Sequence, residues 1–491
     1  MDPSPKALIR LLLPRLPLIF KTALFNALSI SKNSAKQNLT TEVAVVVLRS
    51  IISMRRPVRF LQRVSIKDPG IKGPIWVSKV SLPSPEDGDA LRDAVCAAIA
   101  ELGTGQETYT VPELATVEAE WTGYRSGVSS TEPRLEAAED EQYRKMMKEV
   151  DSDVTILYFH GGAYFLMDPA TVRDSTLRQA KLTRGRCYSV RYRLAPQYPF
   201  PAQLLDALIS YLSLLSPPPG VPHGPVPAKH IVFAGDSAGA NLATALLLLI
   251  LTLRRMGLST IKYHGNDVAI EVPAGVALNS PWVDISRSLP SINKNAHFDY
   301  LDPPTDTGAS RHEPIPDALW PTDPPRADIF CNASMMIHPL TSPVAAAPDL
   351  WKGMPPVFMC LGNEGLEDEI LILARRMHQG GGVVELVGYE GMPHCFAMMF
   401  PTSVSGSDCY KRWCEFSSNV VHGGAQSITS RASWVKAFSK PLQAIEIPIE
   451  QVSSLSDQDV ADAMEKMQLH ALAREKEAQQ KWNERQTRAR L

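Results

Sequence analysis

Strands and helices alternate along the middle of the chain. Short apolar runs of the length of buried strands are followed by stretches in which apolar residues recur at helical spacing. The predicted strands are 116–121, 154–159, 187–192, 231–234, 273–278, 357–361 and 383–387, and the predicted helices are 169–182, 201–215, 240–256 and 366–378. Strands that alternate with helices predict an α/β fold with a mostly parallel sheet covered by helices on both faces.

Two stretches depart from this alternation. Between Ala7 and Ile30 the chain is apolar but interrupted by Arg, Lys and Pro, so we expect helices that either pack over the fold as a cap or lie on a membrane surface. Residues 291–356 are rich in proline and have little periodicity, which predicts a lid-like insertion. The predicted organisation is an N-terminal helical segment 1–110, a main domain 111–425 that contains this insertion, and a C-terminal extension 426–491 that ends in a charged helix.

Composition excludes several classes of function. The 491 residues carry a net charge of −2, which provides no field to attract nucleic acid, and none is expected as a partner. The seven cysteines are scattered and form no Cys-x-x-Cys pair, so they predict neither a disulfide framework nor a zinc site. We therefore expect a cytoplasmic or cytosol-facing protein, with membrane association or the endoplasmic reticulum as alternatives, and no metal or cofactor.

A serine stands between a predicted strand and a predicted helix. The pentapeptide Gly235-Asp236-Ser237-Ala238-Gly239 follows the apolar run 231–234 and opens the helix 240–256. A serine at such a turn is exposed at the carboxyl edge of the sheet, and the N–H of Ala238 points to the same place. We interpret Ser237 as a nucleophile; the alternative is a serine that only caps the helix.

A glycine loop follows the predicted strand 154–159. It reads His160-Gly161-Gly162-Ala163-Tyr164, and glycines allow backbone N–H groups to turn inward. We expect the N–H groups of Gly161 and Gly162, together with that of Ala238, to stabilise an oxyanion. The alternative is a tight turn with no chemical role.

A serine nucleophile needs a base, and the base needs a carboxylate that orients it. His394 follows the predicted strand 383–387, and four acids follow the strand 357–361. Glu364 is the first of these acids and is the expected orienting group, with Asp368 as the alternative. The chain order Ser237, Glu364, His394 is that of an α/β-hydrolase.

These motifs resemble those of the hormone-sensitive-lipase-like group of α/β-hydrolases. The similarity covers about half the chain, from Val154 to Phe396, and four motifs carry it: the loop at His160, the run Tyr192-Arg193-Leu194-Ala195-Pro196 with Pro199-Phe200-Pro201-Ala202, the pentapeptide around Ser237, and Glu364 with Leu366, Asp368 and Glu369. The group usually has aspartate where this chain has Glu364, and a third glycine where it has Ala163. The resemblance implies that residues 111–425 are a catalytic domain and that the N-terminal segment and the insertion form its cap.

The expected function is hydrolysis of carboxylic esters through an acyl-enzyme, as in carboxylesterases, lipases and deacetylases. The alternatives are an amidase, an acyltransferase or a thioesterase with the same three residues, and a binding protein without activity on the same fold. The expected partner is a small-molecule or lipid ester, with peripheral membrane contact through the N-terminal segment as a further possibility. The sequence does not indicate an oligomeric state.

Overall fold

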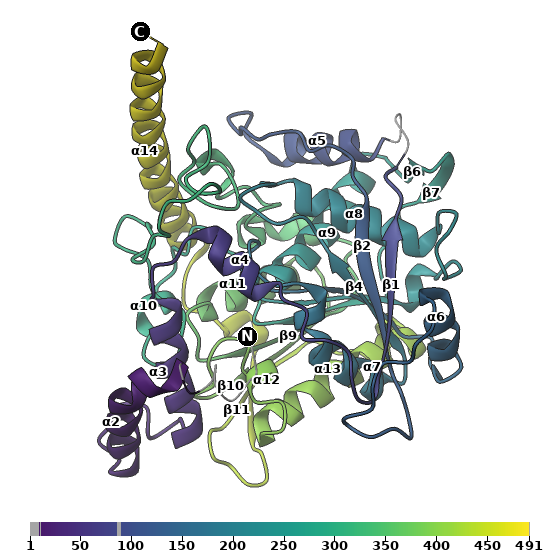
Figure 1. Cartoon of the computed structure of the whole chain (residues 1–491), viewed down its shortest axis with the longest axis horizontal. Helices are drawn as coiled ribbons and strands as arrows, with labels where there is room; N and C mark the ends of the chain where they lie inside the picture. Colours follow the sequence, from purple (N-terminus) through teal and green to yellow (C-terminus); the bar gives the residue numbers. More distant parts are fainter. Residues whose placement is uncertain (1–8, 10, 86–89, 491) are drawn as a thin grey trace.

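A large sheet of ten strands forms the centre of the molecule. The computed structural model describes residues 9, 11–85 and 90–490. The strand order is β1-β2-β4-β3-β5-β8-β9-β10-β11-β12, and the strands from β4 to β11 are parallel. Their bounds are β1 Ile75–Leu82, β2 Val117–Tyr124, β3 Thr155–Phe159, β4 Arg186–Arg191, β5 Ile231–Asp236, β8 Gly275–Asn279, β9 Val357–Gly362, β10 Val384–Tyr389, β11 Arg431–Val435 and β12 Ala444–Ile447. The predicted α/β fold is confirmed, and Figure 1 shows helices on both sides of this sheet.

Alternate residues of each central strand belong to two different cores. On β3, Leu157 and Phe159 face a core that contains α8 (Ala202–Leu215), α9 (Ala238–Arg255) and α11 (Glu367–Gln379). Ile156 and Tyr158 face the other core, which contains α7 (Arg173–Thr183) and α13 (Val404–His422). This alternation follows from the period of two along a strand and explains why the central strands are apolar throughout.

The remaining elements are shorter or lie at the periphery. The other helices are α2 Leu16–Ala27, α3 Leu39–Ile52, α4 Val58–Ser65, α5 Leu91–Leu102, α6 Glu139–Met147, α10 Ser291–Lys294, α12 Phe396–Met399 and α14 Asp457–Arg490, and a small hairpin is formed by β6 (Thr260–Tyr263) and β7 (Asn266–Ala269). Short 3-10 turns span Leu13–Arg15, Pro169–Thr171, Ala228–His230, Ala333–Met335, Pro343–Ala345, Pro348–Trp351, Ala425–Ser427 and Ile449–Gln451.

The sheet extends beyond the main domain 111–425 at both ends. Strand β1 lies in the segment that we predicted to be helical, and it pairs antiparallel with β2 over its whole length. Strands β11 and β12 lie in the C-terminal extension, and β11 continues the sheet next to β10. These segments form strands because they pair with strands that are distant in the sequence. The local sequence pattern does not indicate such pairing.

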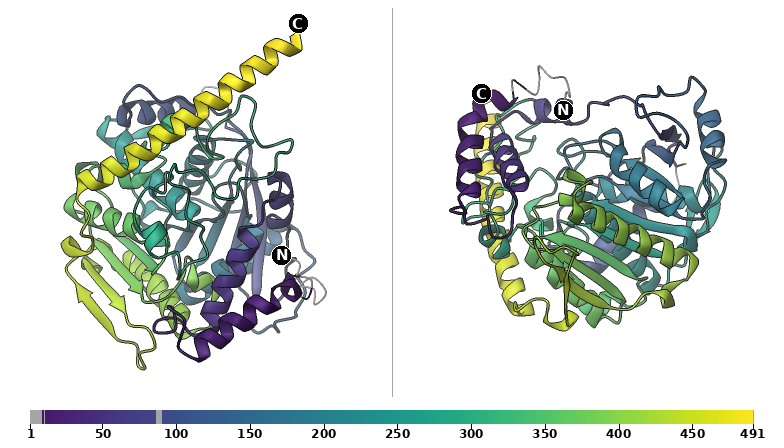
Figure 2. Two further views of the ribbon diagram at one scale, coloured as in Figure 1. Left: turned by 90° about the vertical axis from the view of Figure 1, so that its left-hand side faces the viewer. Right: turned by 90° about the horizontal axis from the view of Figure 1, so that it is seen from below.

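The insertion 291–356 contains almost no regular structure and is held from two directions. On the N-terminal side, Gln37 Nε2 donates to the carbonyl of Phe298 at 2.8 Å, and the Arg49 guanidinium donates to the carbonyl of Asp299. On the C-terminal side, Glu475 of α14 accepts hydrogen bonds from backbone N–H groups of the insertion. Figure 2 shows the N-terminal helices and α14 on the side of the molecule that carries the insertion.

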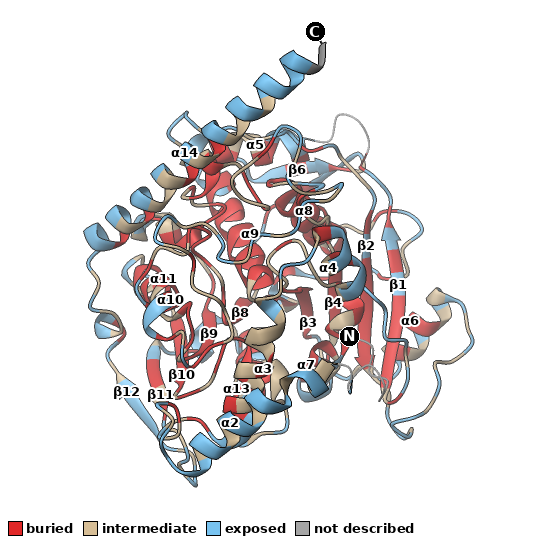
Figure 3. Cartoon of the chain, turned by 60° about the vertical axis from the view of Figure 1, so that its left-hand side comes forward, coloured by how far each residue is buried: buried red, intermediate tan, exposed pale blue. Residues whose placement is uncertain are grey.

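Burial separates the core from these peripheral helices. Figure 3 shows the central strands and α9 buried, whereas α2 and the end of α14 are largely exposed. Among the described residues, α9 is the one helix that is long and apolar enough to cross a membrane, and it lies in the core.

Candidate active site

Ser237 lies at the sharp turn between β5 and α9. Its backbone adopts φ 53° and ψ −121°, a strained conformation for a residue with a side chain. The neighbouring glycines allow this turn. A Cβ on Gly239 would collide with the carbonyl groups of Phe159 and His160 at the end of β3, and one on Gly235 would collide with the first turn of α9. The sequence therefore brings the start of α9 close to β3 and leaves Ser237 partly exposed at the carboxyl edge of the sheet.

Three predicted residues form one hydrogen-bonded chain. The distance between Ser237 Oγ and His394 Nε2 is 2.9 Å, and that between His394 Nδ1 and Glu364 Oε1 is 2.8 Å. Glu364 follows β9 and His394 follows β10, so all three come from carboxyl ends of parallel strands. Glu364 is fully buried and His394 is 3% exposed, so both act in a medium that strengthens their mutual attraction.

The carboxylate that contacts His394 is Glu364. Asp368, the alternative, is the second residue of α11, where its Oδ2 accepts a hydrogen bond from the backbone N–H of Ser291 at 2.8 Å. Asp368 therefore holds the start of the insertion. The longer side chain of glutamate spans the distance from the end of β9 to the imidazole.

The second oxygen of Glu364 is held by two donors. Ser280 Oγ donates to Oε2 at 2.6 Å, and the backbone N–H of Gly362 donates to it at 3.0 Å. Ser280 Oγ in turn accepts a hydrogen bond from the backbone N–H of Cys395 at 3.0 Å. The Ser280 hydroxyl thus links the carboxylate to the residue that follows His394.

A second buried carboxylate ties the same loops together. Asp299 of the insertion accepts hydrogen bonds from the backbone N–H of His394 at 3.1 Å and from that of Gly365 at 2.8 Å. The side chain of Asp299 is fully buried. Burial raises the pKa of Asp299, and the positive charge that His394 can carry opposes this rise. Asp299 therefore fixes the spacing between the loop of Glu364 and the loop of His394.

The surroundings of His394 favour its protonated form. Burial by itself lowers the pKa of His394, but the neighbouring Cys395 and Glu364 outweigh burial, and the pKa lies well above its ordinary value. Burial also raises the pKa of the Cys395 thiol to about 12, so this thiol is uncharged near neutral pH. Glu364 is therefore the group that raises the pKa of His394 under those conditions.

The glycine loop lies beside the turn that carries Ser237. Ala238 is the first residue of α9, so its N–H is one of the donors that a helix leaves free. Gly162 has φ 100°, and a Cβ there would collide with the carbonyl of Leu166. The predicted N–H donors Gly161, Gly162 and Ala238 thus come from two loops at the same edge of the sheet.

Gly161 has a structural contact as well. Burial raises the pKa of Asp236, while hydrogen bonds from the Tyr158 hydroxyl, at 2.7 Å, and from the backbone N–H of Gly161 oppose this rise. A side chain on Gly161 would collide with the Asp236 carboxylate. Gly161 therefore lies against Asp236, which places the glycine loop beside the turn at Ser237.

Aromatic side chains surround the hydrogen-bonded chain. The ring of Tyr300, the residue after Asp299, lies edge-on to the imidazole of His394 with centroids 5.9 Å apart. Tyr164 stacks on Phe330 of the insertion at 3.7 Å, and its hydroxyl donates to Asn241 Oδ1 at 2.8 Å. The insertion thus contributes apolar surface close to Ser237.

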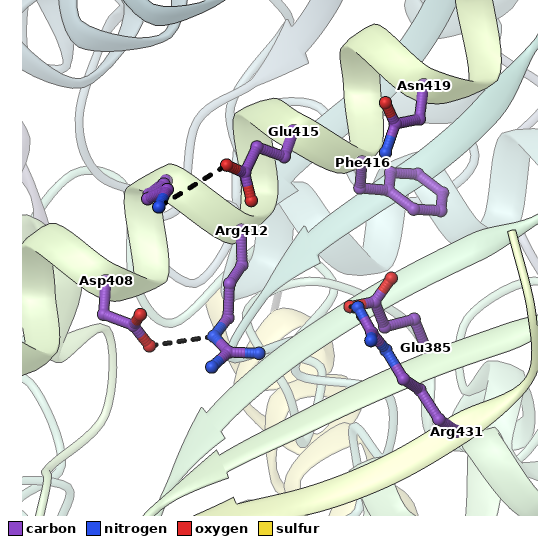
Figure 4. Close-up of a pocket in the computed structure, with 8 residues that line it drawn as sticks. Glu385, Asp408, Arg412, Glu415, Phe416, Asn419 and Arg431 are labelled. Carbon is purple, nitrogen blue, oxygen red and sulfur yellow. Dashed lines mark hydrogen bonds and ion pairs between the residues drawn. The ribbon is translucent and has the colours of Figure 1, made fainter. Parts of the chain in front are cut away.

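A polar pocket of about 210 Å³ lies elsewhere, between α13 and the amino ends of β10 and β11. Its charged side chains pair with one another: Arg431 contacts Glu385, and Arg412 donates to Asp408 at 2.8 Å (Figure 4). Because Ser237 and His394 lie at carboxyl ends of strands, this pocket is remote from them. Within the described ranges, no group of three or more His, Cys, Asp or Glu side chains is arranged to hold a metal ion.

Two polar residues of the site were missed in the sequence. Ser280 follows a buried strand directly, as the predicted residues do, so its position was a usable signal. Asp299 lies in the insertion, where no periodicity distinguishes a buried acid from an exposed one.

Comparisons with known proteins agree with this fold. Residues 156–398 match the family described as having the alpha/beta hydrolase fold. An acetyl-hydrolase of Streptomyces hygroscopicus is 29% identical over 51% of this chain and 71% of its own length. The versiconal hemiacetal acetate esterase of Emericella nidulans is 29% identical over 50% of this chain and 74% of its own. A crystal structure of EstE5 soaked with p-nitrophenyl butyrate is 22% identical, with a TM-score of 0.50 over 77% of this chain and 98% of that one. The four motifs resemble those of the hormone-sensitive-lipase-like group, and the chain belongs to the α/β-hydrolase family.

Proposed function

We propose that this chain is a serine hydrolase that cleaves carboxylic esters through an acyl-enzyme intermediate. The observation that carries the proposal is the hydrogen-bonded chain from Ser237 Oγ through His394 to Glu364, at 2.9 Å and 2.8 Å. A serine hydroxyl is a weak nucleophile unless an adjacent base accepts its proton, and this arrangement provides that base.

In the first step, Ser237 Oγ attacks the ester carbonyl carbon while His394 Nε2 takes its proton. Glu364 stabilises the resulting imidazolium. Collapse of the tetrahedral intermediate breaks the bond to the alcohol, which leaves with the proton from His394. A water molecule then attacks the acyl-enzyme with His394 as base, and the carboxylic acid is released.

Backbone N–H groups stabilise the oxyanion of both intermediates. Gly162 and Ala238 present two of them from loops beside Ser237. The N–H of Gly161, from the same loop as Gly162, is the third donor that we propose. A donor of this kind contributes about 3 kcal/mol to the transition state.

Acetyl and other short acyl esters are the substrates to test first. Two of the relatives carry acetyl or acetate in their names, and each matches over about half of this chain. An ester series from acetyl to palmitoyl would define the acyl specificity, and a maximum at the long end would contradict a preference for short acyl groups.

The proposal as a whole is tested by the Ser237→Ala variant. We expect this variant to hydrolyse p-nitrophenyl acetate at least about a thousandfold more slowly than the parent, and to lose labelling by a fluorophosphonate probe that the parent shows. An unlabelled parent would indicate a binding protein on the same fold, and an unchanged rate would exclude Ser237 as the nucleophile.

A further inference from the structure

Helix α2 presents an entirely apolar face to solvent. The outward residues of α2, with Leu13 in the turn before it and Leu28 directly after it, recur at intervals of three or four, as one side of a helix does. All are exposed: Leu13, Leu16, Pro17, Phe20, Leu24, Ala27 and Leu28. Phe20 is 72% exposed and Leu28 is 58% exposed. We name these seven residues the outer face of α2. No residue of α2 is buried.

Arg15, just before this helix, and Asn26 point the other way, towards α3. Arg15 Nε donates to Ser50 Oγ of α3 at 2.6 Å, and Asn26 Nδ2 donates to Glu42 Oε2 of α3 at 2.6 Å. These bonds fix the rotation of α2, so the helix cannot turn its apolar residues inward. The helix of a globular protein normally places polar residues towards water, and the opposite arrangement marks a surface that contacts a partner.

The charges around the outer face indicate what that partner is. Residues 3–41 contain six Lys and Arg residues and no Asp or Glu. Lys21 borders the outer face, where its ammonium group lies 5.6 Å from the centre of the Phe25 ring, and Lys32 is also exposed. The acid that follows this segment, Glu42, is buried and bonded to Asn26 and Ser31. An apolar stripe bordered by Lys21, in a segment 3–41 without acids, is complementary to an anionic lipid surface, whereas the positive charges of two copies would repel each other.

The outer face is connected to the loops of the active site. The segment between α2 and α3 carries Gln37, whose Nε2 donates to the carbonyls of Phe298 and Gly391, both at 2.8 Å. Phe298 precedes Asp299, and Gly391 lies three residues before His394. The hairpin of α2 and α3 therefore supports the loops that position His394.

We propose that the outer face of α2 docks on an anionic membrane surface, with Phe20, Leu24 and Leu28 in the outer part of the bilayer and Lys21 at the headgroups. Docking requires no chemistry at Ser237, so it stands apart from the proposed hydrolysis. It places the loops of His394 next to the lipid, where esters that partition into membranes are concentrated.

The test is co-sedimentation of the full chain with lipid vesicles. We expect the parent to bind phosphatidylcholine vesicles that contain about 30 mol% phosphatidylserine, and to bind pure phosphatidylcholine several-fold less. Binding should also weaken as NaCl is raised, because salt screens the contact between lysines and headgroups. The Phe20→Glu/Leu24→Glu variant should show at least about tenfold less binding at equal lipid.

The matched control adds the same two charges elsewhere. Val404 and Leu469 are exposed by 56% and 57% and lie on α13 and α14. The Val404→Glu/Leu469→Glu variant should bind vesicles as the parent does. Both double variants should hydrolyse soluble p-nitrophenyl acetate at the parental rate, which shows that they are folded.

Three results would overturn the proposal. The first is absence of vesicle binding by the active parent, and the second is an equal loss of binding in both double variants. The third is a parent that forms a dimer in light scattering and binds no vesicles, while the Phe20→Glu/Leu24→Glu variant is a monomer. The last would identify a second copy as the partner. The Ser237→Ala variant separates the two proposals, since it should lose hydrolysis and keep vesicle binding.

Discussion

The carboxylate of Asp299 accepts a hydrogen bond from the backbone N–H of His394 at 3.1 Å. Its other oxygen accepts one from Gly365, the residue after Glu364, at 2.8 Å. One side chain from the insertion therefore sets the distance between the two loops on which the imidazole and its carboxylate stand. The sheet alone does not fix this distance, because each loop extends beyond the end of its strand.

The Asp299→Asn variant tests this arrangement. An amide of the same shape keeps one acceptor but turns an NH2 group towards a backbone N–H, so one buried hydrogen bond is lost, at a cost of about 1–3 kcal/mol. We expect kcat on p-nitrophenyl acetate to fall about tenfold to a hundredfold with little change in KM.

Asp302→Asn is the matched control. Asp302 lies three residues further along the insertion and accepts a hydrogen bond from Ser53 Oγ at 2.5 Å. It has no contact with the loops of Glu364 and His394 in the described structure. Its substitution should leave kcat within about twofold of the parent. A similar fall of kcat in both variants would show that Asp299 only stabilises the insertion.

A second prediction distinguishes the two acids after β9. Glu364→Gln replaces the carboxylate that holds His394 in its tautomer, and we expect kcat to fall by on the order of 10³. Asp368→Asn affects only the hydrogen bond from Ser291, which an amide oxygen still accepts, and should remain within about fivefold of the parent. Steady-state kinetics on one soluble ester distinguish the two acids. A larger fall of kcat in the Asp368 variant would assign the orienting role to that residue.

Position along the chain was sufficient to predict most of the site. Ser237, Glu364 and His394 each follow a buried strand, and parallel strands bring their carboxyl ends to one edge of the sheet. Asp299 could not be predicted, because it enters the site from a segment without periodicity, through bonds to backbone groups. Strand β1 was missed because the local pattern of 75–82 does not reveal its partner, β2. The outer face of α2 could not be predicted either. The sequence shows that the segment is apolar, but it does not show which side of the helix packs on α3.

The pH dependence of turnover should reflect the raised pKa of His394. The imidazole must be neutral to accept the proton of Ser237, and Glu364 stabilises its charged form, so the pKa lies above the ordinary value of about 6.5. We expect kcat/KM to be low in acid and to rise through one ionisation above that value. Glu364→Gln should move the midpoint to lower pH, because the negative charge that favours the imidazolium is removed.

Cys395→Ala is the control for this profile. Since burial raises the pKa of Cys395 to about 12, its thiol has no charge in the range in which His394 titrates. The variant should therefore keep the midpoint of the parent in kcat/KM measured between about pH 5 and 10. A shift to lower pH would show that the thiol, and not the carboxylate, raises the pKa of His394.

The contact between Glu475 and the insertion predicts how α14 contributes to the cap. Glu475 is buried, and its carboxylate accepts hydrogen bonds from the backbone N–H groups of Ala327, at 2.8 Å, and Ala333, at 3.2 Å. Because the insertion has almost no regular structure, these bonds replace the partners that a sheet or helix would provide.

In the Glu475→Ala variant we expect the insertion to be cleaved at least about fivefold faster in limited proteolysis, since loss of buried hydrogen bonds costs about 1–3 kcal/mol. Glu477→Ala on the same helix removes an exposed carboxylate that pairs only with Lys481, and it should be cleaved at the parental rate. Equal cleavage of the Glu475 variant and the parent would mean that α14 lies against the insertion without holding it.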